Sequence, residues 1–256
     1  MTRRAIRSAV ALLGALIAAL CLPGLAAASS GGGSLGPASD SDGSTLDGGA
    51  VGSGNVTVNA SGDGMTIATR ASALLRNGLV VTGSLPPGDA GKAVALELWG
   101  SKTNWTWQVV AQTQVQSDGT FMAVWNTNHI GRFAIRAVLG AAGGAVGDAS
   151  ASAGLPTVTV TVYRPSLATL YGPGFYGHRT ACGTILRRNS IGLANRTLPC
   201  GTPVAIYYQG RTIIVPVIDR GPYAHGADWD LTMATGRALG MTGTSELGAV
   251  SLPRSS

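Results

Sequence analysis

The feature that most limits the fold of this chain is a series of short runs rich in Val, Thr and aromatic residues between residues 56 and 163. Turn-forming clusters of Gly, Pro, Asn and Asp separate these runs, and in residues 157–162 Thr and Val alternate strictly, as in a half-buried strand. Short strands at this spacing over about 105 residues predict a small β-sandwich of immunoglobulin type. The expected strands are 79–82, 94–99, 107–115, 120–125, 132–138 and 157–162, with a hairpin turn at Ser117-Asp118-Gly119-Thr120.

Four tryptophans of this segment, Trp99, Trp105, Trp107 and Trp125, allow two interpretations. They could form a platform on which sugars stack, or they could fill the core of the sandwich. The core interpretation is favoured, because large aromatic side chains dominate such cores. Trp105 is the best candidate for exposure, since it follows the polar stretch 101–104.

The N-terminus has the layout of a secretory signal peptide. Arg3, Arg4 and Arg7 precede an apolar run at 9–22 and small residues at 26–29. The run is shorter than the roughly 20 residues that a spanning helix needs, so we expect residues 1–28 to be removed and no stable membrane insertion to remain. Leu20 disfavours a lipid anchor on Cys21. Residues 29–54, mostly Gly, Ser, Ala and Asp, are expected to be a disordered spacer.

Charge is unevenly distributed along the chain. Residues 29–163 hold six Lys or Arg against eight acids, whereas residues 164–256 hold nine Arg, no Lys and four acids, a formal charge of +5. A basic domain favours acidic partners, and for an exported protein these are the anionic polymers of a cell wall. Export argues against nucleic acid. The sequence predicts a secreted or cell-wall monomer with neither cofactor nor metal site.

Two cysteines remain after signal removal, Cys182 and Cys200. An even pair in an oxidising compartment usually forms a disulfide, and neither a C-x-x-C spacing nor a neighbouring His cluster supports a redox or metal pair. The sequence therefore predicts a structural disulfide, which would stabilise the fold by about 3 kcal/mol in the chain-entropy model.

Residues 164–256 have a different character, with short strands set among Gly-rich loops. One helix is expected from about Thr232 to Leu239, because Thr232 can cap its start and Gly240 can end it. The expected strands are 168–171, 204–208, 212–218 and a final one at 248–252.

An ordered set of motifs runs through this second part of the chain. It resembles the rare lipoprotein A family, whose fold is the double-psi β-barrel shared with expansins and barwin-like proteins. The resemblance covers about a third of the chain and implies a six-stranded barrel with a short helix at 164–256. With the sandwich predicted at 55–163 from the strand pattern, the chain is expected to be an all-β protein. The motifs are Ala168-Thr169-Leu170-Tyr171-Gly172-Pro173-Gly174-Phe175-Tyr176-Gly177, Thr180-Ala181-Cys182-Gly183, Asn195-Arg196-Thr197-Leu198-Pro199-Cys200-Gly201, Val217-Ile218-Asp219-Arg220-Gly221-Pro222-Tyr223 and Trp229-Asp230-Leu231-Thr232.

The resemblance implies peptidoglycan, or another cell-wall glycan, as the partner. Some family members are lytic transglycosylases, which cleave the bond between N-acetylmuramic acid and N-acetylglucosamine without water. One carboxyl group can both protonate the leaving oxygen and accept the proton of the attacking hydroxyl. The resemblance assigns that role to Asp219, at the end of an apolar run. The alternative role for Asp219 is to hold its turn by accepting backbone hydrogen bonds.

Three positions depart from the active members of the family. Thr184 stands in place of a Glu, Arg187 in place of a further acid, and Asn195 in place of a His. A non-catalytic module of expansin type, which binds or loosens glycan, therefore stays open as the second interpretation.

The remaining candidate residues are assigned to substrate binding. Tyr171, Tyr176 and Tyr223 flank Gly or Pro, so they either stack on sugars or plug the barrel ends. Asn195, Arg220 and Asp230 complete the binding set, although Asp230 could serve only the start of the helix. His178 and His225 are interpreted as solvated loop residues, with a minor acid-base alternative for His225.

Overall fold

The computed structural model describes residues 49–142, 154–223 and 226–253. The predicted signal peptide 1–28, including Cys21, lies outside these residues, as do most of the predicted spacer 29–54 and His225. At the end of the predicted spacer, β1 (Gly52–Ser53) pairs with β13 (Arg211–Asp219).

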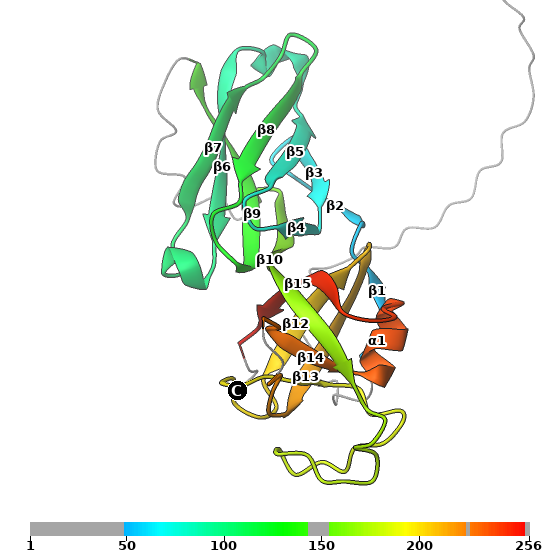
Figure 1. Ribbon diagram of the computed structural model, residues 1–256. Helices are drawn as coiled ribbons and strands as arrows, with labels where there is room; N and C mark the ends of the chain where they lie inside the picture. Colours follow the sequence, from blue (N-terminus) through cyan, green and yellow to red (C-terminus); the bar gives the residue numbers. More distant parts are fainter. Residues whose placement is uncertain (1–48, 143–153, 224–225, 254–256) are drawn as a thin grey trace, which may run out of the picture. The chain divides into compact units, whose positions relative to one another are not determined.

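The first folded part consists of two β-sheets (Figure 1), and their buried side chains form one hydrophobic cluster. Alternation along the strands produces this core, because successive side chains point to opposite faces. In β8 the buried positions are Phe121, Ala123 and Trp125. One sheet contains β2 (Thr57–Gly62), β3 (Met65–Arg70), β5 (Gly78–Ser84) and β8 (Thr120–Asn126), and the other contains β4 (Ser72–Leu74), β6 (Lys92–Trp99), β7 (Gln108–Gln114), β9 (Gly131–Ala142) and β10 (Thr157–Tyr171).

The sandwich agrees with the expected strands but not with the expected hairpin. All six predicted strands form, while β2, β3 and β4 were not anticipated. The hairpin predicted at residues 117–120 is wrong, because β7 pairs with β6 and β8 pairs with β5 in the other sheet. The turn itself is tight, since Asp118 accepts hydrogen bonds from the backbone and side chain of Thr120. The immunoglobulin type of the sandwich stays a prediction.

A single long strand, β10, replaces the two strands expected at 157–162 and 168–171. Its first half pairs with β9 and β4, and its second half pairs with β15 (Ser245–Ser251) and β14 (Trp229–Thr232). Pro165 lies inside it opposite Gly248. Proline has no N–H, so a strand accepts it only where that group is not needed for the ladder.

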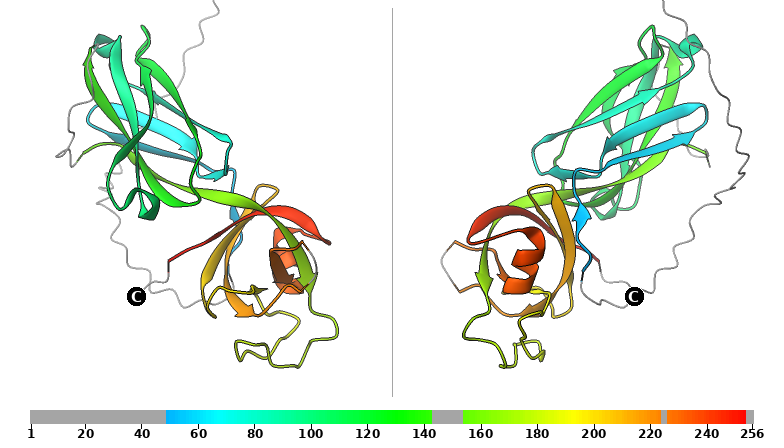
Figure 2. Two further views of the ribbon diagram at one scale, coloured as in Figure 1. Left: turned by 60° about the vertical axis from the view of Figure 1, so that its left-hand side comes forward. Right: turned by 90° about the vertical axis from the view of Figure 1, so that its right-hand side faces the viewer.

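The second folded part is a closed six-stranded barrel (Figure 2). The strands follow each other around it in the order β14, β11 (Leu193–Ala194), β13, β12 (Pro203–Tyr208), β15 and β10, and β14 pairs again with β10 to complete the ring. This architecture fits the predicted double-psi β-barrel. The buried side chains of the interior include Leu193, Val204, Ile206, Ile213, Val215, Val217, Leu231 and Leu239.

The barrel carries α1 (Met233–Leu239), the only α-helix in the described part of the chain. The hydroxyl of Thr232 accepts a hydrogen bond from the Thr235 amide, and Gly240 ends the helix in the left-handed conformation, as the sequence predicts. The predicted fold class is confirmed: mostly β, one short helix and a closed barrel. No helix in the described ranges is long and apolar enough to cross a membrane.

Candidate functional site

Asp219 lies at the last position of β13, where the apolar strand meets the Arg220-Gly221-Pro222 turn. Val215 and Val217 of the strand are buried in the barrel, whereas Asp219 is partly exposed. Gly221 has φ 135°, a backbone conformation that favours glycine and lets the chain turn directly after the carboxylate. The sequence thus places one acid at the point where a buried strand reaches the surface.

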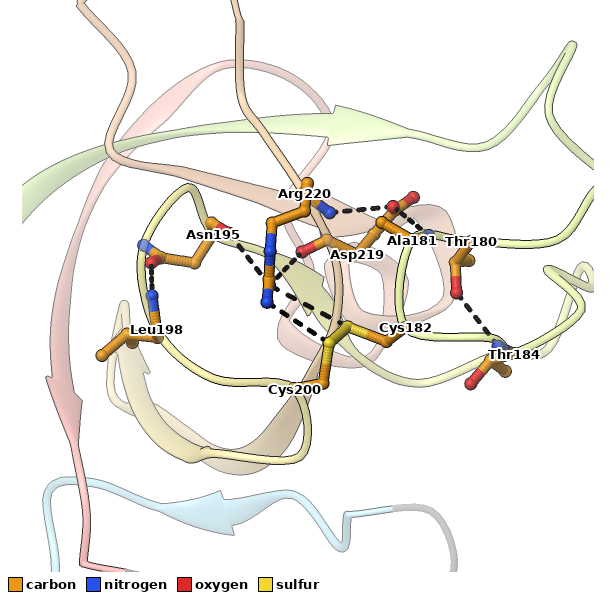
Figure 3. Close-up of a disulfide and its surroundings, with 9 residues drawn as sticks. All are labelled: Thr180, Ala181, Cys182, Thr184, Asn195, Leu198, Cys200, Asp219 and Arg220. Atoms are coloured by element: carbon orange, nitrogen blue, oxygen red, sulfur yellow. Dashed lines mark hydrogen bonds between the residues drawn. A yellow bond between two sulfur atoms is a disulfide. The ribbon is translucent and has the colours of Figure 1, made fainter.

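Backbone amides hold one oxygen of the Asp219 carboxylate (Figure 3). Its Oδ1 accepts hydrogen bonds from the amides of Ala181 at 2.9 Å and of Arg220 at 2.8 Å. Within the described ranges, no hydrogen bond reaches the other oxygen, Oδ2. The carboxylate is therefore fixed in orientation and retains one oxygen for a further partner.

The strand register brings Asp230 and Asp219 to the same level of the barrel. Ala194 of β11 lies opposite Asp219 on one side and opposite Asp230 of β14 on the other. Two strand spacings separate the two Cα atoms, which amounts to about 10 Å. The hydroxyl of Thr169, in the next strand, donates a 2.7 Å hydrogen bond to Oδ1 of Asp230.

The electrostatics of this region favour the protonated forms of two groups. Burial raises the pKa of Asp230, and the nearby charge of Asp219 raises it further, against the opposing hydrogen bond from Thr169. Burial also raises the pKa of Tyr171, with additional contributions from Asp219 and then Asp230. The Tyr171 hydroxyl is buried and has no hydrogen-bond partner among the described residues. Two carboxyls and a phenol thus share one end of the barrel.

Arg220 directs its side chain to the disulfide and not to the carboxylate of Asp219 (Figure 3). Its guanidinium lies 3.4 Å from Sγ of Cys200 and 3.9 Å from Sγ of Cys182, and it donates to the carbonyl oxygens of Asn195 and Asp219, each at 3.4 Å. The Cys182–Cys200 disulfide predicted from the sequence is confirmed. It ties the loop that carries Ala181 to the loop that begins at Asn195.

Asn195 bonds through its side chain to its own loop and to Asp228, whose carbonyl oxygen accepts from Nδ2 at 3.5 Å. Oδ1 accepts hydrogen bonds from the amides of Thr197 at 3.1 Å and Leu198 at 2.9 Å, which is a side-chain-closed turn. Thr184 and Arg187, the other two departures from the family pattern, are exposed, and their backbone amides bond to the side chains of Thr180 and Ser190.

The candidate tyrosines lie in different surroundings. Tyr223 is 81% exposed directly after the turn, whereas the guanidinium of Arg188 lies over the ring of Tyr176 at 5.4 Å. Phe175, 59% exposed, packs edge-on against Tyr171 with ring centroids 6.4 Å apart, and sequence reasoning missed it. The tyrosines were selected because they flank Gly or Pro, and Phe175, which follows Gly174, meets the same criterion.

His178 is exposed, as expected for a solvated loop residue. Over the described ranges, no three His, Cys, Asp or Glu side chains gather as a metal-ligand group.

Residues 166–252 match the domain family described as lytic transglycolase. The chain is 38% identical over 96 residues to the probable endolytic peptidoglycan transglycosylase RlpA of Synechocystis, covering 37% of this chain and 30% of that protein. It is 40% identical over 81 residues to the Aquifex aeolicus protein of the same name, covering 31% of this chain and 36% of that protein. For the endolytic peptidoglycan transglycosylase RlpA of Pasteurella multocida the values are 35% over 83 residues, covering 32% and 28%.

The chain thus spans about a third of the length of these curated relatives. The residues that match the domain family, 166–252, lie in the barrel. The resemblance predicted from the motifs is confirmed for this part of the chain: residues 166–252 are similar to the rare lipoprotein A proteins and match the lytic transglycolase domain family.

Proposed function

We propose that this chain is an exported protein that acts on peptidoglycan through its barrel. Three observations support the proposal: the match of residues 166–252 to the lytic transglycolase family, the names of the relatives, and the Cys182–Cys200 disulfide, which fits an oxidising compartment. The formal charge of +5 on residues 164–256 suits an anionic wall polymer. The cell wall is the location that follows from this substrate.

The reaction that we propose is cleavage of the bond between N-acetylmuramic acid and N-acetylglucosamine, with Asp219 as acid and base. The Asp219 carboxyl gives its proton to the glycosidic oxygen as the bond to the anomeric carbon breaks. The 6-hydroxyl of the muramic acid then attacks that carbon and returns its proton to the carboxylate. The product is a 1,6-anhydro sugar, no water is consumed, and the carboxyl ends as it began.

The observation that carries this proposal is the geometry of the Asp219 carboxylate. Two backbone amides fix Oδ1, and Oδ2 has no hydrogen bond to any described residue, so we assign it to the substrate at the end of the strand. Because the carboxylate is already held in one orientation, the reaction does not require it to reorient, and this lowers the entropic part of the barrier. Because the attacking hydroxyl belongs to the substrate, a second carboxylate is not needed to activate water.

Asp230 and the aromatic residues are assigned to substrate binding. The raised pKa of Asp230 makes a protonated carboxyl available at higher pH than usual, and a protonated carboxyl can donate a hydrogen bond to a sugar oxygen. Tyr171 offers a buried hydroxyl without a partner in the described part of the chain, and Tyr223 offers an exposed ring for stacking on a pyranose. Arg220 acts through the disulfide and the Asn195 carbonyl, so it positions the two loops.

A second candidate function is glycan binding without cleavage, as in expansins. The surroundings of Asn195 favour it. Its side chain closes a turn through Thr197 and Leu198, so it does not replace the family histidine as a proton carrier. The exposed Thr184 likewise carries no acid.

Digestion of peptidoglycan separates the two functions. We expect the wild-type chain to release soluble muropeptides and Asp219→Asn to release none above background. Asparagine keeps an Oδ1 that can accept from the Ala181 and Arg220 amides, so the loop should stay folded. Glu246→Gln, an exposed carboxyl-to-amide change on β15, is the matched control and should leave release unchanged. Wall binding without release by wild type would support the second function.

A further inference from the structure

The sandwich contains a cavity of about 290 Å³ at the edge between its two sheets. β7 and β8, which are the edge strands of their respective sheets, contribute most of the lining. The volume lies at the lower end of the range for small-ligand sites, roughly 300–1,000 Å³, so it suits one ring-sized group. The lining residues are Leu98, Thr103, Gln108, Val109, Val110, Val124, Trp125, Asn126, Asn128 and His129.

One residue of the cavity wall, Trp125, belongs to the core of the sandwich. It is only 2% exposed, its ring packs edge-on against Phe133, and its buried indole N–H has no acceptor among the described residues. Its signal should therefore report occupancy of the neighbouring cavity without a direct hydrogen bond. The remaining polar lining is uncharged amide and hydroxyl, from Gln108, Asn126, Asn128 and Thr103, together with the imidazole of His129. No Asp, Glu, Lys or Arg lines the cavity, which favours a neutral, hydroxyl- or amide-bearing ligand.

An exposed tryptophan lies on the loop that forms one side of the cavity. Trp105 is 56% exposed and belongs to the same short loop as Thr103, which lines the cavity. Asn104 and Trp105 have φ of 52° and 57°, a conformation that side chains other than glycine rarely adopt. Backbone held in such a conformation often marks a functional site.

Neighbouring groups hold this loop in one conformation. The Trp105 amide donates to the Gly100 carbonyl at 3.0 Å, and the Trp99 indole donates to the Trp105 carbonyl at 2.9 Å. The rings of Trp99 and Trp105 meet edge-on with centroids 4.6 Å apart. Beside them the Arg136 guanidinium lies 4.1 Å from the centre of the Trp107 ring and bonds to Glu97 at 2.7 Å. The exposed indole of Trp105 is therefore presented on a rigid base.

We propose that this cavity and the Trp105 ring bind a sugar residue of a glycan chain, as a second glycan site outside the barrel. The amide residues of the lining, Gln108, Asn126 and Asn128, match the hydroxyl and acetamido groups of an N-acetylhexosamine. Val109, Val110 and Val124 provide apolar contact for its methyl group. The flat Trp105 ring suits the apolar face of a pyranose. The choice of peptidoglycan as the glycan rests on the proposed function of the barrel.

Nuclear magnetic resonance of the tryptophan side chains tests this site directly. The chain has five tryptophans, and Trp→Phe variants assign their indole N–H signals. On titration of the whole exported chain with a β-1,4-linked N-acetylglucosamine hexamer, the Trp125 and Trp105 signals should shift. The signal of Trp229, the residue next to Asp230 in the barrel, reports binding at the barrel site separately.

Affinity measurements by calorimetry with the same hexamer then assign the contacts. Trp105→Ala and Asn128→Ala should each weaken the binding by about tenfold, whereas Trp105→Phe, which keeps a flat ring, should restore most of it. Met122→Ala is the matched control, since Met122 has the same 56% exposure but does not line the cavity.

The outcomes distinguish this inference from the proposed function of the barrel. Shifts of Trp125 and Trp105 support the inference even if the chain releases no muropeptides. Release of muropeptides by a chain whose Trp125 and Trp105 signals do not respond to the hexamer overturns it. Equal affinity of wild type and Trp105→Ala overturns it as well.

Discussion

Removal of the Cys182–Cys200 disulfide should destabilise the fold by an amount that follows from the loop it closes. The bond joins positions 18 residues apart in sequence. In the chain-entropy model, a loop of that length restricts the unfolded chain by about 3 kcal/mol. The bond lies within the barrel, at residues 164–256, and for a domain of this size each kcal/mol corresponds to roughly 4–8 °C in melting temperature. In the double variant Cys182→Ser/Cys200→Ser the barrel should therefore melt about 12–24 °C lower than in wild type.

Differential scanning calorimetry with and without reductant measures this effect. Reductant should lower the melting temperature of wild type to that of the double variant and leave the variant unchanged. Residues 55–163 contain no cysteine, so any effect of reductant originates in the barrel. A double variant that melts within about 2 °C of wild type would refute the loop-closure reasoning. An equal response to reductant in the double variant would refute the assignment to these two cysteines.

Three further changes have expected outcomes. The raised pKa of Asp230 means that the folded state binds its proton more tightly than the unfolded state, so wild type loses stability as pH rises from the ordinary value of 3.8 through the folded pKa. Asp230→Asn should consequently melt higher than wild type at neutral pH, with the gain disappearing below about pH 4 in pH-dependent melting. Thr232→Ala removes the cap of α1 and should cost about 1 kcal/mol in urea unfolding, and a change below a few tenths would exclude a capping role. Glu97→Gln replaces the carboxylate that accepts a hydrogen bond from the largely buried Arg136 and should cost about 1.5–3 kcal/mol in urea unfolding, whereas a neutral result would show that the pair is solvent-screened.

The elements that sequence reasoning found are those whose side chains alternate over a long run. β8 and the first half of β10 are examples, because one face of each contributes to the core and the period of two is visible in the residues. The hairpin of β2 and β3 was missed, although Asp63-Gly64 is a two-residue turn signal. Both residues adopt positive φ, 49° and 74°, as that turn requires. The weak apolar content of β2, which is only half-buried, explains why its run did not stand out.

The predictions that were wrong concern which strands pair with each other, and a local sequence pattern carries no information about pairing. The turn at Asp118 has the residues of a hairpin, but its flanking strands join different sheets. Likewise, β10 continues through Pro165, opposite Gly248 of β15, although proline is uncommon inside strands.

The candidate site was located by the order of motifs, and its details came from the register. Asp219 and the disulfide could be predicted because a strand end and an even cysteine pair are local features. That Asp219 and Asp230 lie at the same height in the barrel could not be predicted, because it depends on the pairing of both residues with Ala194 in a third strand. The turn closed by Asn195 and the unpaired indole N–H of Trp125 likewise become visible only when distant segments are placed together.

The central claim, an intramolecular cleavage that uses Asp219, is tested most directly by digesting peptidoglycan in water enriched in heavy oxygen. Mass spectrometry of the released muropeptides then reports the origin of the new end. The account predicts 1,6-anhydro ends without heavy oxygen from wild type and none from Asp219→Asn. New reducing ends that carry heavy oxygen, or anhydro ends from Asp219→Asn in the same yield as from wild type, would contradict it.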